Sequence, residues 1–152
     1  MNGDWRLAKL MKTHCFSLGL CYSNTMSLEI QVLKSLAVVT IFTVLFGTAA
    51  LDKWKSLRTP DWFIKQFENT LIAKLPGGAT AGYWMIATLE LALALAFPAA
   101  FFVSGMLPFA LIGAMFLFAA LCFGLRLAGD FQGSANTFVY FAAAMISLLA
   151  IS

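Results

Sequence analysis

Residues 81–125 read AGYWMIATLELALALAFPAAFFVSGMLPFALIGAMFLFAALCFGL, with Glu90 as the only charged side chain. A transmembrane helix needs about 20 predominantly apolar residues, so this stretch is too long for a single span. A Ser-Gly dipeptide followed by Pro108 marks a turn within it. The pattern therefore predicts two membrane spans, at about residues 81–103 and 108–125.

Two further apolar stretches flank this pair, at about residues 33–51 and 135–152, the second with Ser134 or Asn136 as its N-terminal cap. The whole chain is 61% hydrophobic and 11% charged, whereas soluble domains carry about 25% charged residues. Lipid admits only structures that satisfy their own backbone hydrogen bonds, and the alternating pattern of a β-barrel is missing from the sequence. We therefore predict an all-α integral membrane protein, a four-helix bundle whose first partner is the lipid bilayer.

Residues 60–75 follow the first span and are too polar to form a span themselves. Pro60 and Asp61 are typical of a first helical turn, with Thr59 as the cap. Apolar side chains recur every four residues, while Lys, Gln, Glu and Asn occupy the other face. This pattern predicts an amphipathic helix lying in the membrane interface between spans one and two. Its apolar positions are Phe63, Phe67, Leu71 and Leu75.

Residues 1–27 form an N-terminal tail with weak patterning and without the apolar core of a signal peptide. Met26 opens a tidier segment. Two interpretations stand open: translation starts at Met26, or residues 1–25 are a loose tail. Cys15 and Cys21 lie in this tail, where they could pair in an oxidising compartment.

An even number of spans places both chain termini on one side of the membrane and the 52–80 and 126–133 loops on the other. Lys and Arg number four on the terminal side and six on the loop side. The positive-inside rule decides little between these counts. A start at Met26 would leave one Lys on the terminal side against six Lys and Arg residues on the loop side, which would favour a cytoplasmic loop side. Because the start is not decided, the orientation stays open.

The sequence contains few side chains that could hold a haem, a metal ion or another cofactor. The single His, His14, lies in the tail, which excludes a haem held by His on two helices and a His-based metal centre in the bundle. Cys122 is the only Cys in the predicted spans, which disfavours a paired-thiol oxidoreductase. The sequence contains no phosphate loop, Ser/His/Asp set or nucleic-acid-binding patch. We expect no metal, no nucleic acid and no evident cofactor; whether the chain contributes to an enzyme stays open, and activity by the chain alone is not expected.

The strongest polar signal is Glu90, about nine residues, or roughly 14 Å, into its span. An ionised carboxylate near the middle of a bilayer is costly, so it must be protonated, paired or open to a wet cavity. The same helical face carries Tyr83, Ala87, Ala94 and Phe97. The small residues among these four allow another helix to approach closely.

Two cations stand at the loop-side ends of the neighbouring spans, Lys53 after the first and Arg126 after the third. Either could reach Glu90, and Asp52 and Asp130 balance the charge. Arg126 and Asp130 are also four positions apart and would pair if helix continued there. Two interpretations of this cluster remain open. One is a polar site for a proton, a quinone head group or a lipid head group, and the other is a structural ion pair that fixes helix packing.

The segment Leu45-Phe46-Gly47, followed by Leu51-Asp52-Lys53-Trp54, resembles the end of the first span in the DoxX-like family. Leu89-Glu90-Leu91 resembles that family's second span, which carries a Glu at such a place, although Ala residues stand here where the family often has a Gly-rich stretch. The resemblance covers about residues 30–150 in layout. Between the two segments, the loop helix is similar at Phe63, Phe67 and Thr70.

The resemblance implies a four-helix protein of the bacterial cytoplasmic membrane, and it points to Lys53 and Glu90 as site residues. Members of the family include a subunit of a thiosulfate:quinone oxidoreductase and proteins linked to redox maturation. On this basis we expect an accessory or structural subunit of a redox- or quinone-linked membrane complex, with other subunits or further copies of itself as partners and quinone as a candidate cofactor. The alternatives are a subunit that itself binds quinone near Glu90, and a small proton-coupled transporter or lipid-handling protein that uses Glu90.

The predicted topology can be tested with reporters. Fusions at residue 152 and within the 126–133 loop are expected to give opposite sidedness, because a single span separates the two sites. Paired assays with a periplasmic and a cytoplasmic reporter at each site measure this. Identical sidedness at both sites would contradict the four-span arrangement.

Overall fold

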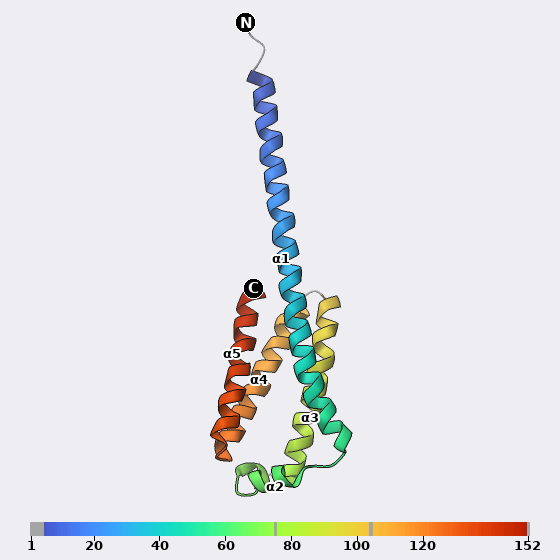
Figure 1. Ribbon diagram of the computed structural model, residues 1–152, viewed down its shortest axis with the longest axis vertical. Helices are drawn as coiled ribbons and strands as arrows, with labels where there is room; N and C mark the ends of the chain where they lie inside the picture. Colours follow the sequence, from blue (N-terminus) through green and yellow to red (C-terminus); the bar gives the residue numbers. More distant parts are fainter. Residues whose placement is uncertain (1–4, 75, 104, 152) are drawn as a thin grey trace. The chain divides into compact units, whose positions relative to one another are not determined.

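The computed structural model describes the backbone of residues 5–74, 76–103 and 105–151, and the side chains of these residues from 28 onward apart from 71 and 72. Every regular element in these ranges is a helix, which confirms the all-α prediction for this part of the chain. The elements in chain order are α1 (Trp5–Ser56), α2 (Asp61–Phe67), the 3₁₀ helix η1 (Leu71–Lys74), α3 (Gly78–Phe102), α4 (Met106–Leu127) and α5 (Phe131–Ile151), as drawn in Figure 1.

The chain divides into two compact units, residues 1–34 and 35–152, and the packing described below belongs to the second. In the first unit the backbone belongs to α1 from Trp5 onward. The first Pro of the chain is Pro60, so no residue in the tail removes a helical amide donor. The side chains of His14, Cys15 and Cys21 lie outside the described residues.

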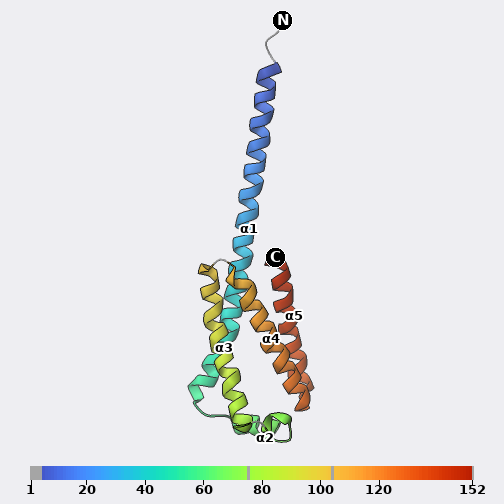
Figure 2. The same ribbon diagram turned by 180° about the vertical axis from the view of Figure 1, so that it is seen from behind.

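Within the described ranges, four helices are long and apolar enough to cross a membrane: Leu28–Ser56 within α1, and the whole of α3, α4 and α5. Each agrees with a predicted span to within five residues at either end. The prediction of a four-span membrane protein is therefore confirmed at the level of helix length and composition. Figures 1 and 2 show α2 lying across the end of the second unit at which α3 begins and α4 ends.

The segment predicted as one interfacial helix is helical in two pieces, α2 and η1. The carbonyl of Phe67 accepts both the Thr70 amide, at 3.0 Å, and the Thr70 hydroxyl, at 2.7 Å. These bonds place the Phe67 carbonyl in a tight turn. In a continuous α-helix this carbonyl would instead accept the amide of residue 71. Phe63 and Phe67 are buried, whereas the side chains of Leu71 and Leu75 lie outside the described residues. The position of this segment in the membrane interface stays a prediction.

The caps of two helices differ from those predicted. The Thr59 hydroxyl oxygen is buried without a hydrogen-bond partner, and the Pro60 carbonyl instead accepts the first amides of α2. Pro60 occupies the cap position itself, with an extended backbone, so Thr59 lies one residue too early to cap. At α5, Oδ1 of Asp130 accepts the Gly133 amide at 2.8 Å. The helix therefore starts before Ser134, which lies inside its first turns.

Stacked phenylalanine rings from three helices form the centre of the second unit. Phe97 of α3 stacks on Phe42 and Phe46 of α1, with ring centroids 5.1 and 5.9 Å apart. Phe46 in turn stacks on Phe118 of α4 at 5.3 Å. Lipid tails are as apolar as these side chains, so close packing and not removal from water holds such a core together. α5 joins the same core through the buried Ala144.

Phe97→Ala is expected to destabilise the bundle by about 3 kcal/mol, because it leaves a cavity between α1, α3 and α4. Phe109→Ala is the matched control, since the Phe109 side chain is 74% exposed on α4. Thermal unfolding of both variants in a mild detergent measures the difference. Equal losses of stability in the two variants would contradict the packing described here.

Candidate functional site

Glu90 lies near the middle of α3 on a stripe of buried residues. The residue is 5% exposed. Tyr83, Ala87, Ala94 and Phe97, the four residues predicted to share its face, are buried as well. Their spacing of three or four positions keeps them on one side of the helix. The carboxylate is therefore enclosed by the bundle and does not face the surrounding membrane.

Lys53 of α1 supplies the opposite charge. Its Nζ lies 2.6 Å from Oε2 and 2.9 Å from Oε1 of Glu90, so the ammonium group donates to both carboxylate oxygens. The Glu90 side chain is 7% exposed and the Lys53 side chain 24% exposed. Contact at this distance offsets part of the cost of removing both charges from water. Of the two cations considered from sequence, the structure places Lys53 at Glu90.

The two partners occupy different places in their helices. Lys53 stands three residues before α1 ends at Ser56, about 5 Å, whereas Glu90 stands twelve residues after α3 begins at Gly78, about 18 Å. The flexible lysine stem spans part of this difference. The rest of this difference in depth means that the first turns of α3 extend beyond the end of α1. The ion pair therefore lies close to the loop-side end of α1, which accounts for the partial exposure of Lys53.

An aromatic cluster, formed by Trp54, Trp84, Tyr83 and Phe63, surrounds this end of the bundle. Trp54 follows Lys53 directly and meets Trp84 edge-on, with ring centroids 5.6 Å apart. Tyr83 touches Trp84 at 5.7 Å and Phe63 at 5.2 Å. The cluster thus joins α1, α3 and α2 beside the ion pair. Trp and Tyr side chains are common at the boundary between membrane and water, where the loop-side ends of the spans are predicted to lie.

The other predicted site residues lie elsewhere. Arg126 is exposed and stacks over the Phe131 ring, 5.0 Å from its centroid. The Arg126–Asp130 pair, which was predicted only if helix continued between the two residues, does not form, because α4 ends between them with Gly129 in the left-handed conformation (φ 79°). Asp130 caps α5 instead. Asp52 is exposed near the end of α1. The structure thus reduces the predicted cluster of five residues to one pair.

Two polar contacts were missed from sequence. The Gln66 side-chain amide donates to Oδ2 of Asp130 at 3.3 Å, which ties α2 to the start of α5. The Ser134 hydroxyl contacts Sγ of Cys122 at 3.3 Å and donates to the Cys122 carbonyl at 3.3 Å, which ties α5 to α4. Gln66 is an ordinary polar residue of an amphipathic segment, so no sequence signal marks its partner. Cys122, the only Cys in the predicted spans, is thus half-buried and has polar contacts.

No group of three or more His, Cys, Asp and Glu side chains that could hold a metal ion occurs among the residues that the structure describes. The arrangement that remains is a lysine–carboxylate pair inside a helical bundle. Such a pair can lock two helices together, or it can exchange a proton or a charged ligand. No protein-family model, curated protein or solved structure matches this chain. The function is accordingly inferred from the site and from the sequence resemblance.

The ion pair predicts a specific pattern of coupled stabilities. Glu90→Gln and Lys53→Met are each expected to lower the free energy of unfolding by about 1–3 kcal/mol, because each leaves one buried or partly buried charge without its counter-charge. The double variant is expected to lose less than the sum of the two, by about 1 kcal/mol or more. Unfolding in detergent measures all three variants.

Two controls accompany this cycle. Lys55→Met removes an exposed cation two residues away and is expected to be nearly neutral. Arg126→Met combined with Glu90→Gln is expected to be additive, because Arg126 contacts Phe131 instead of Glu90. Strict additivity of the Glu90 and Lys53 variants would rule out the ion pair.

Proposed function

We propose that this chain is a DoxX-like integral protein of the bacterial cytoplasmic membrane, and that it serves as an accessory or structural subunit of a redox- or quinone-linked membrane complex. The observation that carries the proposal is the Lys53–Glu90 pair. The resemblance points to these two residues, which are 37 positions apart in sequence. A likeness in hydropathy alone gives no reason for their charged groups to meet, yet they form a hydrogen-bonded ion pair.

The residue types in the spans favour an accessory role over electron transfer through haem or iron–sulfur centres. Subunits of that kind hold these groups with His and Cys ligands. Residues 28–152 contain no His and one Cys. An ion pair between α1 and α3 instead fixes how two helices pack, and buried ionic groups serve this purpose in some proteins. A helix pair held in one arrangement provides a defined surface for a neighbouring subunit or a second copy of the chain.

A second candidate function is proton-coupled transport or lipid handling through Glu90. The observation in its favour is the unequal exposure of the two partners, 7% for the Glu90 side chain and 24% for Lys53. A proton or a cationic group arriving from the loop side can replace the ammonium group at the carboxylate. Neutralising Glu90 in this way would release Lys53, which gives a two-state switch of the kind that transporters need.

Purification and reconstitution distinguish the two functions. A tagged chain, extracted from its native membranes in a mild detergent, is expected to retain other membrane subunits in a fixed ratio, measured by quantitative mass spectrometry. The Glu90→Gln/Lys53→Met double variant is expected to lose them, whereas Lys55→Met retains them. The opposite result is that the purified chain alone, reconstituted in liposomes, takes up a solute together with protons, and that Glu90→Gln abolishes this uptake. That result would overturn the accessory role and support the second function.

A further inference from the structure

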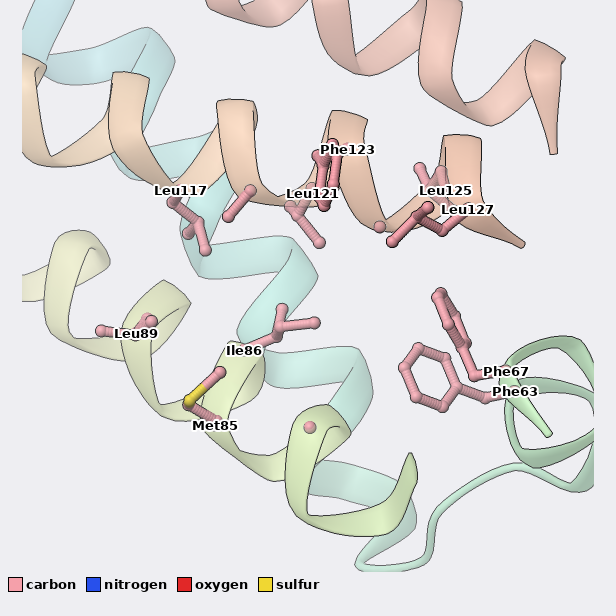
Figure 3. Close-up of a pocket in the computed structure, with 13 residues that line it drawn as sticks. Phe63, Phe67, Met85, Ile86, Leu89, Leu117, Leu121, Phe123, Leu125 and Leu127 are labelled. Carbon is pink, nitrogen blue, oxygen red and sulfur yellow. The ribbon is translucent and has the colours of Figure 1, made fainter. Parts of the chain in front are cut away.

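An apolar cavity of about 350 Å³ lies between α2, α3 and α4. Figure 3 shows Phe63 and Phe67 of α2 pointing into the space between the two spans, with Met85 and Leu89 on the α3 side and Leu121 on the α4 side. This cavity is not the Lys53–Glu90 site. Its α3 residues form a stripe that is rotated by about 100° from the Glu90 stripe, at 100° per residue.

The cavity exists because several of its lining residues are small. Gly82, Ala120 and Gly124 border it, and none of them carries more than a methyl group. Every lining residue is apolar, and a water molecule needs two to four polar partners to occupy a cavity. An apolar cavity of about 150 Å³ accommodates benzene in other proteins. A space of 350 Å³ therefore suits a longer apolar group.

The cavity opens on the outer surface of the spans. Met85, Leu89 and Phe123 line it and are 61%, 46% and 65% exposed. The medium outside a membrane span at this level is the hydrocarbon of the bilayer. An apolar group can therefore enter sideways from the membrane without crossing a polar surface.

The length and direction of the cavity match one leaflet. On α4 its lining runs from Leu127, the last residue of the helix, to Leu117, about 15 Å further in. On α3 it runs from Gly82 to Leu89, about 10 Å. The hydrocarbon core of a bilayer is about 30 Å thick, so one leaflet is about 15 Å deep. The cavity thus begins at the loop-side ends of the spans and extends inward over a length comparable to the depth of one leaflet.

We propose that this cavity holds one acyl chain of a phospholipid from the loop-side leaflet. An acyl chain has the required apolar chemistry, and in a leaflet it runs from the interface to the midplane, as the cavity does. A helix of a second copy is about 10–12 Å wide with its side chains, which is too wide for a space of this volume. The proposal is independent of the proposed function, because it uses none of the residues of the ion pair.

α2 retains the chain at the interfacial end. Phe63 and Phe67 cover that end of the cavity. The helix is fixed by the Gln66–Asp130 hydrogen bond and by the contact of Phe63 with Tyr83. A lipid chain held between α2, α3 and α4 exchanges more slowly than one that touches the open surface of a span.

The test uses a matched pair of variants on α4. Ala120→Phe adds a ring at a residue that lines the cavity, whereas Ala119→Phe adds the same ring at the preceding residue, which is equally exposed but does not line the cavity. The proteins are reconstituted in phosphatidylcholine vesicles that contain a small fraction of phosphatidylcholine with a photoactivatable diazirine midway along one acyl chain. Peptide mapping after illumination compares labelling at Leu121, in the cavity, with labelling at Phe116, an exposed residue of the same helix.

We expect labelling at Leu121 to exceed that at Phe116 severalfold in the parent chain and in Ala119→Phe, and to fall to the Phe116 level in Ala120→Phe. Native mass spectrometry of detergent-washed protein is expected to show one retained phospholipid, lost in Ala120→Phe alone. Equal labelling at both residues in the parent chain would overturn the proposal. So would a dimer that Ala120→Phe dissociates, because the cavity would then belong to an interface between copies. Thermal unfolding confirms that both variants are folded.

Discussion

A chain that crosses a membrane must supply partners for its own polar groups, because the hydrocarbon supplies none. Here this requirement acts most strongly at Glu90, whose two carboxylate oxygens are both bonded by Lys53. The pair sets the relative depth of two helices, since a residue near the end of α1 must reach one in the middle of α3. Several weaker polar groups meet the same requirement locally, although the Thr43 hydroxyl in α1 is buried without a hydrogen-bond partner. The hydroxyl groups of Thr40, Thr48, Thr88 and Ser147 donate to the carbonyls four residues earlier in their own helices.

The spans were predictable because hydropathy and length are properties of each segment by itself. The prediction for residues 108–125, for example, differs from α4 by two residues at each end. The details at helix ends were less predictable, since several residues there offer bonds of similar strength. Asp130 and Ser134 are both good caps, and the choice of Asp130 follows from the turn that ends α4 at Gly129. The break between α2 and η1 likewise depends on the Thr70 bonds to Phe67.

Glu90, the central residue of the site, was predictable from the sequence, but the geometry around it was not. Glu90 stands out because a charge within an apolar run needs an explanation. The partner of Glu90 does not stand out in the same way, because Lys53 and Arg126 both lie at the ends of neighbouring spans. Only the packing of those helices decides which of the two cations is close to Glu90. The structure resolves the choice, because Lys53 bonds to Glu90 while Arg126 lies over the Phe131 ring. The cavity had no sequence signal either. Gly82, Ala120 and Gly124 resemble positions where small residues let helices approach, yet here they border an open space.

α3 thus has two different surfaces along one length of helix. The stripe containing Glu90 faces α1 and carries the ion pair, while the stripe containing Met85 and Leu89 faces the cavity. The two meet at Tyr83, which lies on the Glu90 stripe and touches Phe63 of α2. A displacement of α2 therefore acts on the stripe that holds the ion pair, two helical turns from Glu90. For this reason we expect substitutions at Tyr83 to affect both sites, and substitutions at Lys53 and Ala120 to act on the ion pair and the cavity separately.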